Sequence, residues 1–246
     1  FHSLALGATF VVWHLMLRRL GNFDDVRRNF SIYYLSTLAK RIPSAIWYVG
    51  GRLMMYQRLG VSRSAVLNAT ALETLLIGAA GILVYLVLQP FYTYAIANAT
   101  WILAIIGGLA SIAFLVRPRL LIEISNAVLR RLKRQPIQVD LSRRDLLLWG
   151  GIYLIPWPLA GVSLYFMIQA ITVGVPADLV SIIGVSTLSM LVALLTVILP
   201  GGLGLKELTI AGLLSTWMPL SAGIVVAIAY RVLQTLDEVL WAALAH

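Results

Sequence analysis

The sequence contains no cysteine and few charged residues. Without cysteine in its 246 residues, the chain can form no disulfide, offers no thiolate nucleophile and has no cysteine ligand for a metal. Asp, Glu, Lys and Arg make up 12% of the residues, roughly half the fraction of an ordinary soluble domain. Hydrophobic residues make up 60%, and several apolar runs reach the roughly 20 residues that cross a bilayer. The composition therefore predicts an all-α, polytopic integral membrane protein.

Acidic residues are also scarce beside basic ones. The chain has 10 Asp and Glu against 19 Lys and Arg, a formal net charge of +9. In a membrane protein such an excess is typical of cytoplasmic loops, so it indicates orientation rather than nucleic-acid binding. This rule places three basic segments inside: 17–41, 58–63 and 117–144. It places three turns that lack basic residues outside, near residues 90, 174 and 218. The pattern predicts a multi-pass protein of the cell (plasma or inner) membrane.

Little in the sequence points to catalysis or to a metal. The histidines, His2, His14 and His246, are scattered, and neither they nor the acids have the spacing of a metal-ligand cluster. Residues 201–206 lack both the full glycine spacing of a phosphate loop and the Ser or Thr that follows its lysine. We therefore expect no cofactor and no metal, and we find no catalytic constellation.

Two proline-marked breaks interrupt the apolar stretches. Around Pro200 the sequence removes a backbone donor and adds three glycines, so a continuous helix is not expected there. Pro43 separates two apolar pieces that are each too short to span a bilayer. Broken backbone at membrane depth is tolerated only where it is buried in protein or lines a wet cavity. We interpret both breaks as tips of re-entrant helical hairpins; for the first, a pair of interfacial helices stays open as the alternative.

The apolar segments and breaks together predict an internal repeat. Five spans are expected, near 1–18, 62–89, 99–117, 145–171 and 220–245, and Pro156 and Pro158 should kink or break the fourth. The Pro43 hairpin leaves and returns to the inner side and the Pro200 hairpin to the outer side, so the halves are inverted. We expect a single transmembrane domain: repeat one at about 1–117, an inner-surface linker at about 118–144 and repeat two at about 145–246. A further helix is expected after residue 246, because repeat two lacks a counterpart to the span at 99–117.

Charged residues inside the apolar segments mark the candidate site. The first half carries Arg52 and Glu73, and the second half carries Lys206, Glu207 and Arg231. An unpaired charge at the bilayer centre costs about 2.5–3.5 kcal/mol on translocon scales, so these side chains should pair or face a shared water-filled cavity. Inverted repeats built on broken helices, with charge near the midplane, are typical of membrane transporters.

These motifs resemble a known family. Pro43, Arg52, Leu59-Gly60-Val61-Ser62 and Glu73, followed by Pro200-Gly201-Gly202-Leu203-Gly204 with Glu207 and Arg231, resemble the transmembrane flippase-like domain of lysylphosphatidylglycerol synthases. The resemblance covers roughly residues 30–245 and departs from the family pattern at Ser44, where a glycine is usual. It implies movement of lipids or lipid-linked head groups between leaflets. The implied partners are membrane phospholipids with an anionic or zwitterionic head group.

The predicted substrate-binding residues come from both halves: Arg52, Glu73, Pro200, Gly201, Gly202, Gly204, Lys206, Glu207 and Arg231. The basic side chains would attract a phosphate, and the two glutamates would limit the positive charge. Two other functions stay open. The chain could be the membrane part of a lipid-modifying transferase whose catalytic domain lies outside it, or a membrane scaffold or accessory subunit whose charges only hold helices together. A homo-oligomer also stays open.

Overall fold

The computed structural model describes residues 1–39, 45–89, 141–172, 174–196 and 204–245, with the single positions 117, 123, 126, 127, 130 and 131. These residues form helices and turns, and no strand occurs among them. The predicted all-helical fold is confirmed. The helices are α1 (His2–Gly21), α2 (Val26–Leu38), α3 (Ala45–Gln57), α4 (Arg63–Leu88), α7 (Arg143–Tyr153), α8 (Pro156–Ile171), α9 (Leu179–Thr196), α10 (Leu205–Leu214) and α11 (Leu220–Leu244).

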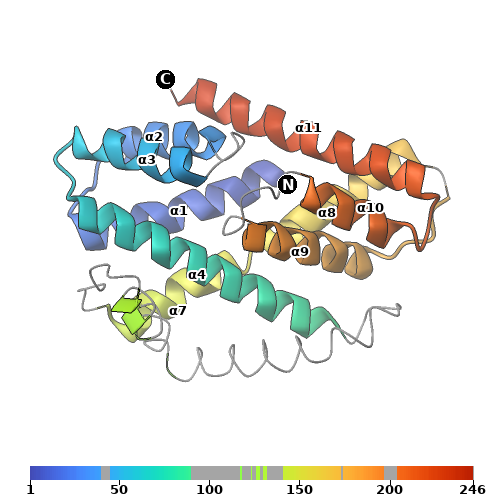
Figure 1. The fold of residues 1–246 in the computed structure, drawn as a ribbon, viewed down its shortest axis with the longest axis horizontal. Coiled ribbons are helices and arrows are strands. Elements are labelled where there is room, and N and C mark those ends of the chain that lie inside the picture. The colour runs from blue at the N-terminus through green and yellow to red at the C-terminus, as the bar shows by residue number, and fades with distance from the viewer. Residues whose placement is uncertain are drawn as a thin grey trace.

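The longer helices run roughly along the long axis of the molecule (Figure 1). Helix α1 lies in the middle, with α11 on one side of it and α4 with α7 on the other. Helices α2 and α3 pack together at one end, and α8, α9 and α10 pack together at the other. The α2–α3 group and the α8–α9–α10 group thus lie at opposite ends of the molecule, and α1, α4 and α11 run between them.

Within the described residues, three helical stretches are long and apolar enough to cross a membrane: Arg63–Leu88, Arg143–Ile171 and Leu220–Leu244. They correspond to three of the five expected spans. Helix α1 covers the expected first span but is not among the three, and the span near 99–117 lies outside the described residues. Helix α9 contributes a shorter apolar helix over Leu179–Leu194.

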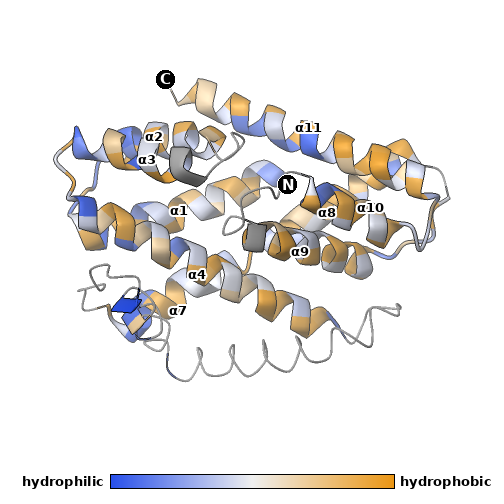
Figure 2. Cartoon of the chain, in the orientation of Figure 1, coloured by the Kyte–Doolittle hydropathy of each residue, from blue (hydrophilic) through white to orange (hydrophobic). Residues whose placement is uncertain are grey.

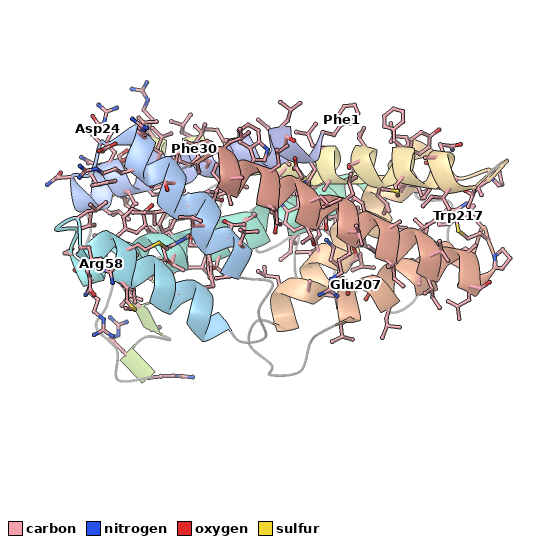
Figure 3. The ribbon with its side chains drawn as sticks, turned by 90° about the horizontal axis from the view of Figure 1, so that it is seen from above. Phe1, Asp24, Phe30, Arg58, Glu207 and Trp217 are labelled. Atoms are coloured by element: carbon pink, nitrogen blue, oxygen red, sulfur yellow. The ribbon has the colours of Figure 1, made fainter. Side chains whose placement is uncertain are left out.

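The surface divides along the same axis. Hydrophilic residues gather at the end where α1 meets α2, where α3 meets α4 and where α7 begins (Figure 2). Figure 3 labels Asp24 and Arg58 at this polar end and Trp217 at the opposite end. Helix α11 exposes a row of large apolar side chains, the arrangement that lipid contact requires and that water disfavours: Ile224, Val225, Ile228, Val232, Leu233 and Leu236.

Local sequence signals explain where the helices start. Ser142 and Asp145 form the expected capping box at the start of α7, since each side chain bonds the other residue's backbone N–H. Helix α7 ends at Tyr153 and α8 begins at Pro156, whose missing N–H costs nothing in the first turn. The predicted break at the two prolines is confirmed.

An aspartate caps the start of α9 outside the spanning segments. Asp178 accepts hydrogen bonds from the backbone N–H of Ser181 at 2.8 Å and from its hydroxyl at 2.6 Å. Burial of the carboxyl acts to raise the pKa of Asp178, but these hydrogen bonds outweigh it and the pKa is lowered. The charged carboxylate therefore stabilises this helix start at neutral pH.

Buried apolar side chains form two clusters. The first lies mainly among α1, α2, α3, α4 and α7, with Trp13, Leu72 and Tyr153 fully enclosed. The second joins α8, α9, α10 and α11 around Leu164 and Leu214. Helices α8 and α9 are in close contact at Gly161, where an added Cβ would lie 2.5 Å from Ile183 Cα. Only a glycine fits this contact, because the obstacle is backbone.

Replacing Gly161 by alanine should therefore force α8 and α9 apart. We expect Gly161→Ala to cost about 1–3 kcal/mol, as overpacking does in other tight cores, and to lower Tm. The matched control is Gly212→Ala in α10, where an added Cβ meets nothing within 4 Å. That change should be neutral or gain about 0.5–1 kcal/mol from helix propensity. Thermal unfolding in detergent measures both, and equal stability of the two variants would contradict the close contact.

Candidate functional site

The first charged centre is an ion pair between α3 and α4. Arg52 Nη1 lies 2.6 Å from Glu73 Oε2, and the side chains are 0% and 7% exposed. The Tyr48 hydroxyl, one helical turn before Arg52, donates to the same carboxylate oxygen at 2.8 Å. Tyr33 of α2 donates to Glu73 Oε1 at 3.4 Å. Among the described residues, the carboxylate is held by the Arg52 cation and by the hydroxyls of Tyr48 and Tyr33.

The guanidinium of Arg52 is enclosed as completely as its partner. Its Nε donates to Ser36 Oγ at 3.0 Å. Its central carbon lies 3.8 Å from the centre of the Trp13 ring and 4.4 Å from that of Tyr48, so the cation is stacked between aromatic faces. Four helices, α1 to α4, thus contribute to one buried charge pair. Such contacts offset the desolvation that makes buried ion pairs costly.

The second charged centre lies between α10 and α11 and is more open. Glu207 Oε1 lies 3.1 Å from Arg231 Nη1, with side chains 18% and 39% exposed. Beside this pair, Lys206 Nζ donates to Gln234 Oε1 at 2.7 Å and lies 5.3 Å from the centre of the Tyr230 ring. Figure 3 shows Glu207 beneath α11, between the polar end and the Trp217 end of the molecule. The centre is therefore partly accessible at mid-length of the helices.

A backbone turn at Gly204 positions the side chains of the second centre. Gly204 has a φ of 92°, a left-handed conformation that favours glycine, and it is the N-cap of α10. The turn brings Lys206 and Glu207 into the first turn of that helix. Pro200, Gly201 and Gly202, which were also predicted to bind substrate, lie outside the described residues.

The predicted charged residues thus come together as two pairs, each made within one half of the chain. Arg52 pairs with Glu73, and Glu207 pairs with Arg231. Each pair joins two helices that follow one another in the chain, α3 with α4 and α10 with α11. Among the described residues, no ion pair links one centre to the other.

Several residues of these centres were not predicted. Tyr48 precedes Arg52 by one helical turn and Gln234 follows Arg231 at helical spacing, so each shares a helix face with a predicted residue and could have been found. Trp13, Tyr33 and Ser36 come from other helices. No spacing in the sequence connects them to Arg52, because only packing brings them together.

A third polar contact ties α1 to α11. His2 Nδ1 lies 2.6 Å from Asp237 Oδ2, and the Ser3 hydroxyl donates to Asp237 Oδ1 at 2.6 Å. The next residue, Glu238, is buried. The acids of α11 therefore continue the line of polar groups that begins at Arg231 and Gln234.

The described residues contain no group of three or more His, Cys, Asp or Glu that could hold a metal ion. A shallow surface pocket of about 260 Å³ lies at the polar end, away from both centres. It is lined by Arg28, Ser31, Ile32, Met55, Arg58 and Leu59. None of its lining residues belongs to either ion pair, so the pocket is not the candidate site.

The apolar helices and the charges buried among them define an α-helical membrane protein. More particularly, residues 1–240 match the family described as lysylphosphatidylglycerol synthase TM region. The chain belongs to that family, which confirms the resemblance of its motifs, and the family points to a role related to membrane lipids. Comparison with curated proteins and with solved structures gives no match.

The two ion pairs should differ sharply in their contribution to stability. Glu73→Gln leaves Arg52 buried without a counter-charge and should cost about 3–5 kcal/mol. Glu207→Gln removes a partly exposed partner and should cost about 0–1 kcal/mol. Thermal unfolding of the two purified variants measures the difference.

A double variant separates the cost of an unpaired charge from the value of the pair. Arg52→Met with Glu73→Met removes both buried charges, so it should recover part of the stability lost in Glu73→Gln. If Glu73→Gln and Glu207→Gln unfolded at the same temperature, Arg52 would not be sealed in the way described.

Proposed function

We propose that this protein moves phospholipids, or lipid-linked head groups, between the two leaflets of a cell membrane. The observation that carries the proposal is the partly exposed Glu207–Arg231 pair beside Lys206. It lies under α11, whose surface is otherwise a row of exposed apolar side chains. A charged head group cannot cross about 30 Å of hydrocarbon unaided. A polar site set in a lipid-facing surface would carry it while the acyl chains stay in lipid.

The second centre has the donors that a phosphate needs. Arg231 and Lys206 supply positive charge, and the first N–H groups of α10 add the positive end of a helix dipole. Glu207 already pairs with Arg231, so an entering phosphate would have to compete for that guanidinium. Binding should therefore be weak and reversible, as transport requires. Anionic and zwitterionic head groups both satisfy this chemistry.

We further propose that the chain is built from two inverted repeats, each containing a re-entrant hairpin. Helices α2 and α3 pack together, as do α9 and α10. In both cases the second helix of the hairpin pairs with the following helix, Arg52 with Glu73 and Glu207 with Arg231. The signs are exchanged between the two. A repeated relation of this kind supports a common origin of the halves, and inverted repeats are the basis of alternating access in many transporters.

The unequal exposure of the two pairs fits such a cycle. The Arg52–Glu73 pair is closed and the Glu207–Arg231 pair is partly open. In the proposed cycle the Glu207–Arg231 pair closes while the Arg52–Glu73 pair opens. Arg52 and Glu73 then contact the head group. A partly exposed ion pair adds at most about 1 kcal/mol of stability, so a purely structural role gives little reason for it and the asymmetry favours transport.

Reconstitution into vesicles tests the proposal. Protein in proteoliposomes that carry a fluorescent phospholipid in one leaflet should speed the loss of leaflet asymmetry. Glu207→Ala and Arg231→Ala should each slow it severalfold without unfolding the protein, because each removes one member of the open pair. Arg18→Ala is the matched control. It removes a cation at the polar end whose side chain is 63% exposed, and it should leave the rate unchanged.

The readout is the fraction of fluorescence open to an external quencher over time. The assay covers several lipid classes, each with and without an ion gradient. Equal rates in protein-free, wild-type and mutant vesicles under all these conditions would reject transport and favour the scaffold.

A further inference from the structure

A group of buried polar side chains lies between the two charged centres without hydrogen-bond partners in the part of the chain that the structure describes. The atoms are Tyr153 Oη, Trp157 Nε1, Ser186 Oγ and Thr187 Oγ1. Tyr153, Ser186 and Thr187 are 0% exposed and Trp157 is 3% exposed. We propose that these four side chains bind a buried chain of water molecules that connects the Arg52–Glu73 centre with the Lys206–Gln234 centre.

Three of the four side chains, those of Trp157, Ser186 and Thr187, lie at the same height along the axes of the α8–α9 pair. The two helices are joined by the short connection 172–178, so they run antiparallel. Gly161 of α8 meets Ile183 of α9. One turn back from Gly161 is Trp157, and one turn forward from Ile183 is Thr187, so these two side chains share a level. Ser186 directly precedes Thr187.

Tyr153 lies between these three side chains and the Arg52–Glu73 centre. It is the last residue of α7 and lies four residues before Trp157, across the break between α7 and α8. Tyr153 is close enough to Glu73 and Arg52 to interact with both electrostatically. Arg52 adds an unpaired donor of its own, because its Nη2 atom is buried and has no hydrogen-bond partner. The polar row thus reaches the buried ion pair.

Tyr230 extends the row toward the second centre. Its hydroxyl donates to the carbonyl of Ala160 at 2.8 Å, in the same part of α8. It also lies near Ser186 and Gln234. Gln234 in turn accepts the hydrogen bond from Lys206. A row of buried polar side chains from α7, α8, α9 and α11 therefore lies between the Arg52–Glu73 centre and the Lys206–Gln234 centre.

Free energy and donor chemistry both favour water as the occupant. A buried polar atom without a partner costs about 1–3 kcal/mol, and four or five of them on one path would be a large share of the stability of a domain. The indole N–H can only donate, whereas the three hydroxyls both donate and accept. Water matches this mixture, since a buried water typically makes about three hydrogen bonds to such groups. An anion would leave the hydroxyl acceptors unused.

Radical footprinting detects bound water at buried side chains without any transport assay. X-ray radiolysis of the purified protein in detergent produces hydroxyl radicals from bound as well as bulk water, and these oxidise adjacent side chains. Trp157 should be oxidised severalfold faster in the wild-type protein than in a variant that cannot hold the water. That variant is the matched control, because it leaves Trp157 and its packing in place.

A double variant tests whether the hydroxyls hold the water. Ser186→Ala with Thr187→Val removes both while keeping size and apolar packing. If water is bound, oxidation of Trp157 should fall severalfold in this variant and Tm should not rise, because hydrogen bonds to water are lost. If the path is dry, Trp157 should be oxidised at the same rate in the wild type and in the double variant, and the double variant should raise Tm by removing unpaired polar atoms. The dry result would overturn this inference and leave the proposed lipid transport untouched.

Discussion

The burial of Arg52 against Glu73 is the constraint on which the first half of the structure depends. A guanidinium removed from water needs a counter-charge, hydrogen bonds and polarisable contacts at the same time. Glu73 supplies the first, Ser36 the second, and the rings of Trp13 and Tyr48 the third. Because these partners come from α1 to α4, the pair fixes how those helices pack. The apolar core then fills the space around it.

The second half of the structure also pairs an acid with an arginine, but this pair is only partly buried. Glu207 and Arg231 pair between neighbouring helices, but the charges remain in contact with the surroundings. The turn at Gly204 places Lys206 beside them. Its ammonium donates a hydrogen bond to Gln234 and lies over the ring of Tyr230. A fully enclosed pair favours rigidity, whereas an incompletely enclosed one can exchange its partner for a ligand. The contrast between the two centres is the feature of the fold that supports the proposed movement of a charged head group.

Much of this could be read from the sequence, because the bilayer imposes simple rules. Low charge and long apolar runs determined that the chain is helical and lies in a membrane, since an apolar run of that length satisfies its backbone hydrogen bonds there as a helix. Pro156, with no N–H to donate, determined the break between α7 and α8. Ser142 and Asp145 determined the start of α7. The charged residues of the centres were also predicted, because charges in apolar helices are rare and costly.

Only the tertiary structure decided how these charges are arranged. The sequence allowed one shared cavity, whereas packing produced two separate pairs, because each acid is nearest to the base on an adjacent helix of its own half. The aromatic enclosure of Arg52 and the level at which Trp157 and Thr187 meet depend on contacts between helices far apart in the chain. Helical periodicity shows which face of one helix a residue occupies. It does not show which helix that face meets, and that choice rests on the summed packing of all of them.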